Sequence, residues 1–296
     1  MPANEVRPCP ACLRGDSRAT GEVYGFRMQA CRGCGTLFTD RLPAAAEAAD
    51  YGGYYHPGNL EVPAFVHQQL ERLVASFEPG RRLNRWLDVG CGAGALMAAA
   101  RRGGWEVIGT EIAADAAEAV RAEGFEVRTG DLDQLGLPGG GFDVISIVEV
   151  IEHVPDPRAL LDTAGELLRP EGELYLTTPH ARGVSARLLG TGWSVITPPE
   201  HLQLFSIRGL RAATAGAGLR VRELHTHAVD PSELVRAARS RGGRAVHPPA
   251  RVESSYRLNE ALSSNRAGAI LKRVANATLS AARLGDSLKV VAERPL

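Results

Sequence analysis

An apolar run that ends at Val89 passes through three alternating glycines into a helix-like stretch that begins at Ala95. The glycines are Gly90, Gly92 and Gly94. Glycine permits a tight turn and lets a ligand approach the backbone closely, and the start of a helix presents N–H groups without partners inside the helix. A strand, a glycine turn and a helix in this order predict a small-molecule site at a strand-to-helix crossover.

Strand-like and helix-like patterns alternate along the chain on both sides of this turn. Helix-like stretches at 95–102 and 113–122 are closed by glycine, a common helix stop, at 103–104 and at 124. Repeated alternation of this kind is typical of a parallel sheet with helices on both faces, so we expect an α/β, Rossmann-like fold. The apolar runs that we interpret as strands lie at 85–89, 106–112, 125–128, 142–148, 173–177, 219–225 and 288–292.

Acidic residues occur at three successive strand ends. Asp88 lies just before the glycine turn, Glu111 ends the next strand, and Asp131 follows the third. A carboxylate at Asp88 would repel a pyrophosphate but suits an ammonium group, which favours S-adenosylmethionine over a dinucleotide. Glu111 lies where doubly wound folds bind ribose hydroxyls. Asp131 can accept a hydrogen bond from an adenine amino group, with the backbone amide of Leu132 beside it. Solvated carboxylates are the alternative for each acid taken singly.

These segments, together with Phe-Asp-Val-Ile at 142–145 and Glu-Val-Ile-Glu-His-Val-Pro-Asp-Pro at 149–157, resemble the ordered motifs of class I methyltransferases, nearest the ubiquinone-biosynthesis O-methyltransferase type. The resemblance covers about residues 63–226 and the final strand at 285–291. It implies a seven-stranded sheet whose last strand is antiparallel, and S-adenosylmethionine as methyl donor. The cofactor-binding residues are then Asp88, Gly90, Gly92, Gly94, Glu111, Asp131, Leu132 and Glu149.

Methyl transfer requires an aligned acceptor and, for a hydroxyl or carbon acid, removal of a proton. Glu149, Glu152 and His153 follow a strand and would share one face of a helical turn. His153 is therefore a candidate general base. A divalent metal held by these three residues, as thought for some ubiquinone-type O-methyltransferases, is an alternative. A further alternative is that His153 only supports the cofactor pocket.

A second candidate for the base follows the fifth strand. Glu200 and His201 are adjacent in a loop, and His201 is our preferred base because imidazole titrates near neutral pH. Ser206 is predicted to cap a helix that begins at Ile207. A similar Glu-His pair occurs in sugar C-methyltransferases, which also carry an N-terminal zinc module. The tyrosine that precedes the pair in those enzymes is absent here, where two prolines stand in its region.

Four of the five cysteines form two C-x2-C pairs. Cys9 and Cys12 are separated by eighteen residues from Cys31 and Cys34. Four thiolates at this spacing are typical of a tetrahedral, structural Zn²⁺ site, with redox dithiols as the alternative. Paired cysteines that hold a metal also suit a reducing compartment, so we expect a cytoplasmic protein.

The predicted organisation follows from these features. Residues 1–42 form a zinc-ribbon module, 43–80 a linker and helix, and 81–226 with 285–296 the methyltransferase domain. Residues 227–284 form a helical insertion, with a helical pattern at 258–284. We interpret the insertion as a cap over the site; a packing extension or a dimerisation element, which would give a homodimer, is the alternative.

Charge and hydropathy limit the partners. The chain has 34 basic and 34 acidic residues, so its net charge gives no field that would hold a polyanion, and no stretch is apolar enough for a membrane span. We expect methyl transfer to a small molecule, with a hydroxyl oxygen as first choice, in secondary-metabolite or surface-glycan biosynthesis. The alternatives are carbon methylation of a nucleotide-linked sugar, a zinc-ribbon rRNA methyltransferase that uses the ribbon's arginines, and a non-catalytic cofactor-binding scaffold.

Overall fold

The computed structural model describes residues 6–47, 49, 64–229, 274 and 277–296. Its contacts divide the chain into two compact units. The cysteine unit comprises residues 1–48, 178–212 and 224–289, and the sheet unit comprises 49–177, 213–223 and 290–296. The N-terminal cysteine segment thus clusters with segments that follow it by more than 130 residues.

A seven-stranded sheet has the order β10-β11-β8-β7-β4-β5-β6. Strands β4 to β8 pair in parallel, and β4 lies between β5 and β7. The order therefore reverses beside β4, and ligands bind at such a switch point in open α/β sheets. The bounds are β4 (Arg85–Val89), β5 (Glu106–Glu111), β6 (Glu126–Thr129), β7 (Phe142–Val148), β8 (Leu168–Pro179), β10 (Arg220–His227) and β11 (Ser287–Glu293).

The last strand runs antiparallel to its neighbour β8. The N–H of Glu171 donates to the carbonyl of Arg294 at 2.8 Å, and the N–H of His180 donates to the carbonyl of Asp286 at 2.7 Å. Residue numbers rise along β8 as they fall along β11, which defines an antiparallel pair. The predicted α/β sheet of seven strands with an antiparallel last strand is confirmed.

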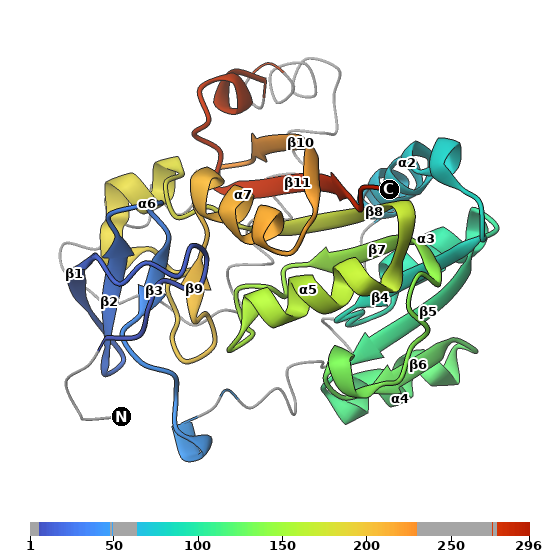
Figure 1. Cartoon of the computed structure of the whole chain (residues 1–296), viewed down its shortest axis with the longest axis horizontal. Helices are drawn as coiled ribbons and strands as arrows, with labels where there is room; N and C mark the ends of the chain where they lie inside the picture. Colours follow the sequence, from blue (N-terminus) through green and yellow to red (C-terminus); the bar gives the residue numbers. More distant parts are fainter. Residues whose placement is uncertain (1–5, 48, 50–63, 230–273, 275–276) are drawn as a thin grey trace. The chain divides into compact units, whose positions relative to one another are not determined.

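Helices cover the sheet unit on both faces. Trp86 and Val144 on the sheet form one core cluster with apolar residues of α2 and α3, and Met97 of α3 packs with Val120 of α4 in another. In Figure 1, α5 crosses in front of β7 and β4. The bounds are α2 (Ala64–Ser76), η2 (Glu78–Gly80), α3 (Ala95–Arg102), α4 (Ala114–Ala122), η3 (Leu132–Gln134) and α5 (Pro157–Leu167).

The cysteine unit contains a second, four-stranded sheet in the order β1-β2-β3-β9. Figure 1 shows β9 beside the blue N-terminal strands, although it lies about 160 residues later in the sequence. Met28 and Leu204 pack with Trp193, Val195 and Ile196 in the core of this unit. The bounds are β1 (Ser17–Val23), β2 (Phe26–Cys31), β3 (Leu37–Thr39), η1 (Ala45–Glu47), α6 (Val184–Leu189), η4 (Gly190–Gly192) and β9 (Gln203–Leu204).

Helix α7 (Ile207–Gly216) follows β9. The hydroxyl of Ser206 accepts a hydrogen bond from the N–H of Gly209 at 2.9 Å, which confirms Ser206 as the predicted N-cap. Of the helical pattern predicted at 258–284, residues 274 and 277–281 are helical and 282–284 are not, while 258–273 and 275–276, and with them most of the predicted insertion, lie outside the described residues.

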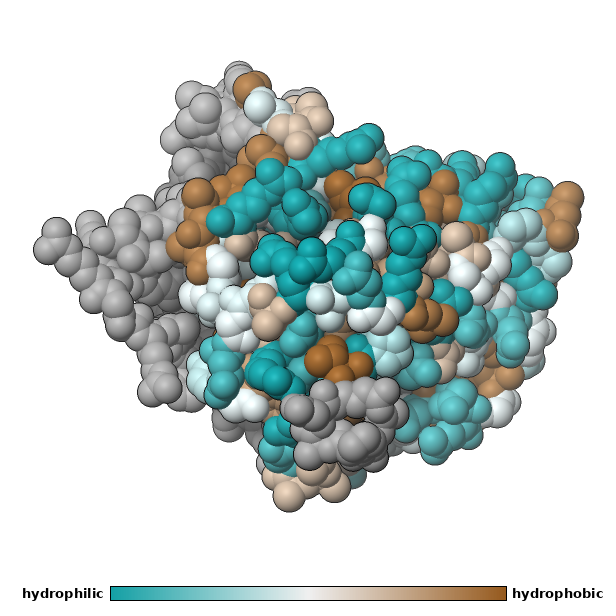
Figure 2. Space-filling view, turned by 60° about the vertical axis from the view of Figure 1, so that its left-hand side comes forward, coloured by the Kyte–Doolittle hydropathy of each residue, from teal (hydrophilic) through white to brown (hydrophobic). Residues whose placement is uncertain are grey.

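Exposed large apolar side chains are scattered over the described surface. They include Leu13, Tyr24, Leu188 and Ile112, each more than half exposed. On the face seen in Figure 2, apolar residues in brown form separate spots among hydrophilic residues in teal. No described helix has the length and apolar character that a bilayer span requires.

Candidate active site

The glycine turn after β4 has a backbone that only glycine adopts easily. Gly90, Gly92 and Gly94 have φ of 68°, 51° and 72°, all in the left-handed region. At Gly90 space is also missing, since a Cβ there would lie 2.5 Å from Cγ2 of Val150. The turn therefore brings bare backbone to the carboxyl end of β4, and α3 begins immediately after it at Ala95.

Asp88, at the end of β4, is buried and held by a chain of hydrogen bonds. The Ser146 hydroxyl donates to Asp88 Oδ1 at 2.5 Å, and the indole N–H of Trp86 donates to the Ser146 oxygen at 2.9 Å. Burial raises the pKa of Asp88 to about 7, the Ser146 hydrogen bond opposes this rise, and the nearby Glu111 adds to it. The motifs did not identify Ser146; a lone hydroxyl within the apolar run of β7 was its only signal.

Glu111, at the end of β5, is also buried. Its two carboxylate oxygens accept the backbone N–H groups of Gly92 and Ala113, each at 3.0 Å. A carboxylate has about four acceptor positions, so ribose hydroxyls can still bind. Asp131 is exposed at the start of η3, with Leu132 buried beside it. The structure thus places the three predicted acids at the ends of adjacent strands.

The charges beside the glycine turn are unbalanced. Asp88 and Glu111 are both buried, and among the described residues neither forms an ion pair with a basic side chain. Burial, and to a smaller extent the two acids, also raise the pKa of the Cys91 thiol in the turn. Buried carboxylates are costly unless they meet a partner of opposite charge. The site therefore suits a ligand that carries positive charge, as the amino-acid portion of S-adenosylmethionine does.

The segment after β7 is a turn and not the helical turn that the spacing predicts. Glu149 has a left-handed φ of 54° and is exposed, whereas Glu152 is buried, and the N–H of His153 donates to the carbonyl of Val150 at 2.9 Å. The left-handed residue turns the backbone away from a helical path, so the three side chains do not share a helix face. Among the described residues, no metal-binding group of ligand atoms unites Glu149 with Glu152 and His153.

Glu200 and His201 lie in the cysteine unit, in a turn before β9. The N–H groups of both residues donate to the carbonyl of Thr197, and the Thr197 hydroxyl donates to Glu200 Oε2 at 3.2 Å. His201 Nδ1 lies 2.5 Å from the carbonyl oxygen of Val195. A carbonyl can only accept, so Nδ1 carries the proton in the neutral ring and Nε2 is the basic nitrogen.

The four cysteines of the ribbon come together as their spacing predicts. The sulfur atoms of Cys9 and Cys34 are 3.6 Å apart, those of Cys12 and Cys31 are 3.5 Å apart, and none forms a disulfide. All four sulfurs lie within 4.8 Å of one another. Tetrahedral Zn²⁺ with Zn–S bonds of about 2.3 Å needs sulfurs about 3.8 Å apart. The four thiols therefore fit a zinc ion with a complete set of ligands.

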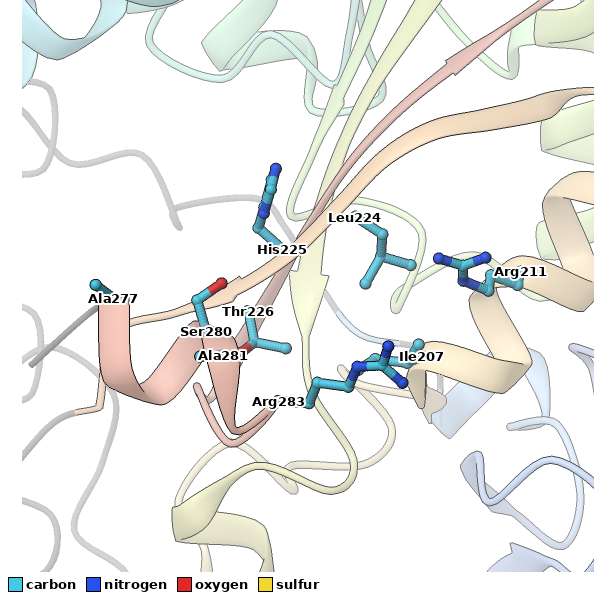
Figure 3. Close-up of a pocket in the computed structure, with 9 residues that line it drawn as sticks. All are labelled: Ile207, Arg211, Leu224, His225, Thr226, Ala277, Ser280, Ala281 and Arg283. Atoms are coloured by element: carbon cyan, nitrogen blue, oxygen red, sulfur yellow. The ribbon is translucent and has the colours of Figure 1, made fainter.

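A pocket of about 440 Å³ lies in the cysteine unit beside β10 (Figure 3). Arginines contribute to its lining from α7 and from the turn before β11, and none of the described residues that line it carries a carboxylate. None of the residues that the sequence predicts for cofactor, zinc or proton transfer belongs to it. The lining residues are Ile207, Arg211, Leu224, His225, Thr226, Ala277, Ser280, Ala281 and Arg283.

Comparison with known proteins finds relatives that are named methyltransferases. A family model described as "Methyltransferase domain" matches residues 62–224. The chain is 30% identical over 202 residues to the ubiquinone biosynthesis O-methyltransferase of Parvibaculum lavamentivorans, a match that covers 61% of this chain and 78% of that one. The enzyme of the same name from Xanthomonas axonopodis pv. citri is 34% identical over 117 residues, which cover 37% of this chain but only 48% of that relative.

A solved structure shares the fold. The crystal structure of a SAM-dependent methyltransferase from Archaeoglobus fulgidus superposes with a TM-score of 0.51 at 18% identity, over 77% of this chain and 93% of that one. The strand order, the glycine turn with its buried acids and the family match over more than half of the chain agree. The chain belongs to the methyltransferase-domain family and is a class I S-adenosylmethionine-dependent methyltransferase.

Proposed function

We propose that this enzyme methylates a hydroxyl oxygen of a small molecule, in secondary-metabolite or surface-glycan biosynthesis. The names of the relatives, ubiquinone biosynthesis O-methyltransferases, support an oxygen acceptor. The pathway rests on the resemblance alone. A cytoplasmic location stays a prediction from the paired cysteines.

The cofactor side of the proposal uses the residues around the glycine turn. Asp88 and the turn hold the amino-acid portion, Glu111 the ribose hydroxyls, and Asp131 with the Leu132 amide the adenine, while Glu149 borders the pocket. When bound, S-adenosylmethionine supplies an electrophilic methyl group on a positively charged sulfur. The buried carboxylates of Asp88 and Glu111, which have no basic partner among the described residues, favour this cation.

The acceptor side of the proposal assigns His201 as general base. Its Nδ1–H donates to the Val195 carbonyl, and this single observation carries the assignment because it leaves Nε2 as the nitrogen that takes up a proton. In the proposed step the acceptor hydroxyl would give its proton to His201 Nε2 as its oxygen bonds to the methyl carbon, and the bond from that carbon to the sulfonium sulfur would break, leaving S-adenosylhomocysteine. Glu200 lies beside His201 and would stabilise the imidazolium that forms, and His153 is the second candidate for the base.

An rRNA substrate is less favoured by the arginines of the ribbon. Arg27, Arg32 and Arg41 form ion pairs with Asp40, Asp16 and Glu47. A fourth, Arg7, hydrogen-bonds within the protein. Guanidinium groups that are already engaged in this way contribute less to phosphate binding. We therefore propose a small-molecule acceptor and no nucleic-acid partner, with carbon methylation of a nucleotide-linked sugar as the alternative.

The acceptor class is tested by a screen of phenolic and sugar hydroxyls against nucleotide-linked ketosugars, with methyl transfer detected by mass spectrometry. His201→Asn should reduce turnover of the cognate acceptor at least 100-fold and leave the affinity for S-adenosylhomocysteine unchanged. His225→Asn, outside the loop, is the matched control. A fully active His201→Asn variant would refute the assignment. Methylation of a carbon atom alone would favour the alternative.

The predicted divalent metal at Glu149, Glu152 and His153 needs its own test. Ligand atoms of Glu152 and His153 lie within 4.8 Å of each other, but Glu149, which has a left-handed backbone, joins no such group among the described residues. Turnover of the zinc-loaded enzyme should not change when Mg²⁺ is added or removed with a chelator too weak to extract zinc. Dependence on Mg²⁺ that Glu149→Gln abolishes would establish the metal.

A further inference from the structure

The chain just after Glu200 and His201 is built into the sheet of the cysteine ribbon. Strand β9 pairs antiparallel with β3, with Leu204 opposite Leu37 and Gln203 opposite Phe38. The N–H of Thr39 donates to the carbonyl of Leu202 at 3.0 Å, which extends the pairing by one step toward His201. A strand of two residues makes too few hydrogen bonds to hold its place alone, so other contacts must secure it.

Arg7 supplies such contacts from the start of the chain. Its Nε donates to the carbonyl of Thr39 at 2.8 Å, and its Nη2 donates to the carbonyl of Leu202 at 2.8 Å and to Gln203 Oε1 at 3.2 Å. The guanidinium also lies over the ring of Phe38, 5.7 Å from the centroid. One planar fork therefore binds β3 and the segment that enters β9 together, which a lysine ammonium on a flexible stem cannot reproduce.

The second cysteine pair secures the other end of the same segment. The hydroxyl of Ser206 donates to the carbonyl of Cys34 at 2.6 Å. Gly209, in the first turn of α7, packs so closely on Thr36 that a Cβ would overlap the Thr36 hydroxyl, and it would also crowd Ala11. The segment 202–209 is thus held at its start by Arg7 and at its end by the residues around Cys34.

We propose that Arg7 is a positioning residue that holds the Glu200–His201 loop on the cysteine ribbon, so that the ribbon serves the proton-transfer side of the reaction. The inference rests on the proposed role of His201. A base must be held to within a fraction of an ångström of its productive position, and a surface loop by itself does not provide this precision. The four thiols fit zinc, and a zinc-bound ribbon would give Arg7 a rigid base from which to act.

The test compares Arg7→Ala with Arg27→Ala in the zinc-loaded full-length protein. Arg27 belongs to the same ribbon, but its side chain is half exposed and pairs with the mostly buried carboxylate of Asp40. For each variant we would measure zinc content, affinity for S-adenosylhomocysteine, hydrogen exchange in peptides covering 37–40 and 197–206, and turnover of the acceptor found in the screen. Arg7→Lys, which keeps the charge and loses the fork, serves if Arg7→Ala does not fold.

We expect Arg7→Ala to keep its zinc and its cofactor affinity, to exchange at least tenfold faster in both peptides, and to lose 10- to 100-fold in kcat. Arg7→Lys should fall between the wild type and Arg7→Ala, and Arg27→Ala should match the wild type. Exchange in Arg7→Ala equal to that in Arg27→Ala would overturn the inference. So would full turnover in Arg7→Ala while His201→Asn is inactive. If His201→Asn is also fully active, the assignment of His201 as the base is wrong. The hydrogen-exchange data alone then show whether Arg7 holds the loop on the ribbon.

Discussion

The glycine turn and the His201 loop are positioned in opposite ways. In the sheet unit, the hydrogen bond between Gly92 and Glu111 joins residues 19 positions apart, and the left-handed glycines shape the turn locally. In the cysteine unit, the hydrogen bond between Arg7 and Leu202 joins residues 195 positions apart. The glycine turn is formed by a short stretch of chain and can be recognised in the sequence. The His201 loop takes its position only when segments far apart in the sequence pack together.

The two regions also differ in how completely their polar and charged groups are paired within the protein. Around His201 the described polar groups find protein partners, such as the Val195 carbonyl and Thr197. Beside the glycine turn, two buried carboxylates have no basic partner among the described residues. The first region is therefore expected to gain stability from its contacts, and the second to be stabilised by its ligand.

The largest effect is expected from removal of a zinc ligand. Cys31→Ser should lose the bound zinc and unfold the four-stranded sheet, because the binding energy of a structural zinc, about 10 kcal/mol or more, is folding energy. Cofactor affinity should change less than threefold if the glycine turn is built locally. Zinc analysis and calorimetry with S-adenosylhomocysteine measure the two effects, with Cys91→Ser as a variant that keeps its zinc. If Cys31→Ser lost cofactor binding as well as zinc, the glycine turn would depend on the ribbon and would not be built locally.

Asp88→Asn should separate stability from function at the glycine turn. The folded pKa of Asp88 is about 7, above its ordinary value of 3.8, so the unfolded carboxyl releases its proton first as pH rises. The free energy of unfolding should then fall between about pH 4 and pH 7, by at most on the order of 4 kcal/mol.

The Asp88→Asn protein without cofactor should therefore be more stable than the wild type at pH 8, and this difference should disappear by about pH 3, as measured by urea unfolding. Its affinity for S-adenosylmethionine should drop about 100-fold, since a charged partner is lost. Asp131→Asn, at an exposed position, should leave the stability unchanged. Equal stability of Asp88→Asn and the wild type at pH 8 would show that the buried carboxylate carries no cost.

Gly90→Ala tests whether space or backbone conformation shapes the turn. We expect a destabilisation of about 2–4 kcal/mol, because the new methyl group meets Val150 in addition to the left-handed strain. Gly136→Ala is the matched control, since its φ of 60° is similar but nothing lies within 4 Å of its Cβ position. It should lose only about 1 kcal/mol. If adding Val150→Ala to the Gly90→Ala variant restores none of the lost stability, the steric explanation is wrong.

The smallest effect is expected from Ser146→Ala. The Ser146 hydroxyl lowers the pKa of Asp88, so its loss should raise that pKa and reduce the ionised fraction at neutral pH. Affinity for S-adenosylmethionine should fall about tenfold at pH 7, a loss of roughly 1–2 kcal/mol, and recover largely at pH 9. Titration calorimetry across this pH range checks the profile, with the exposed Ser76→Ala as control. A loss that is equal at both pH values would contradict a role through ionisation.

Much of the sheet unit could be predicted from the sequence. The predicted bounds of β4, β7 and α3 agree with the structure, and the ordered motifs place acids at the ends of β4, β5 and β6. Local rules suffice there, because apolar periodicity decides strand or helix and a glycine with positive φ is a property of a few residues. The turn at Glu149 was missed because a single left-handed residue overrode a spacing that suits a helix.

The sequence by itself determined the fold class, the cofactor family and the four thiols that fit zinc, since each depends on residue types at short, fixed spacings. Only the tertiary structure decided that β9 completes the ribbon sheet, that Arg7 binds Leu202, and that Ser146 holds Asp88. Those contacts join residues 58 to 195 positions apart, and no local pattern encodes them. They form because burial in a packed interior requires each donor and acceptor to find a partner, wherever along the chain that partner lies.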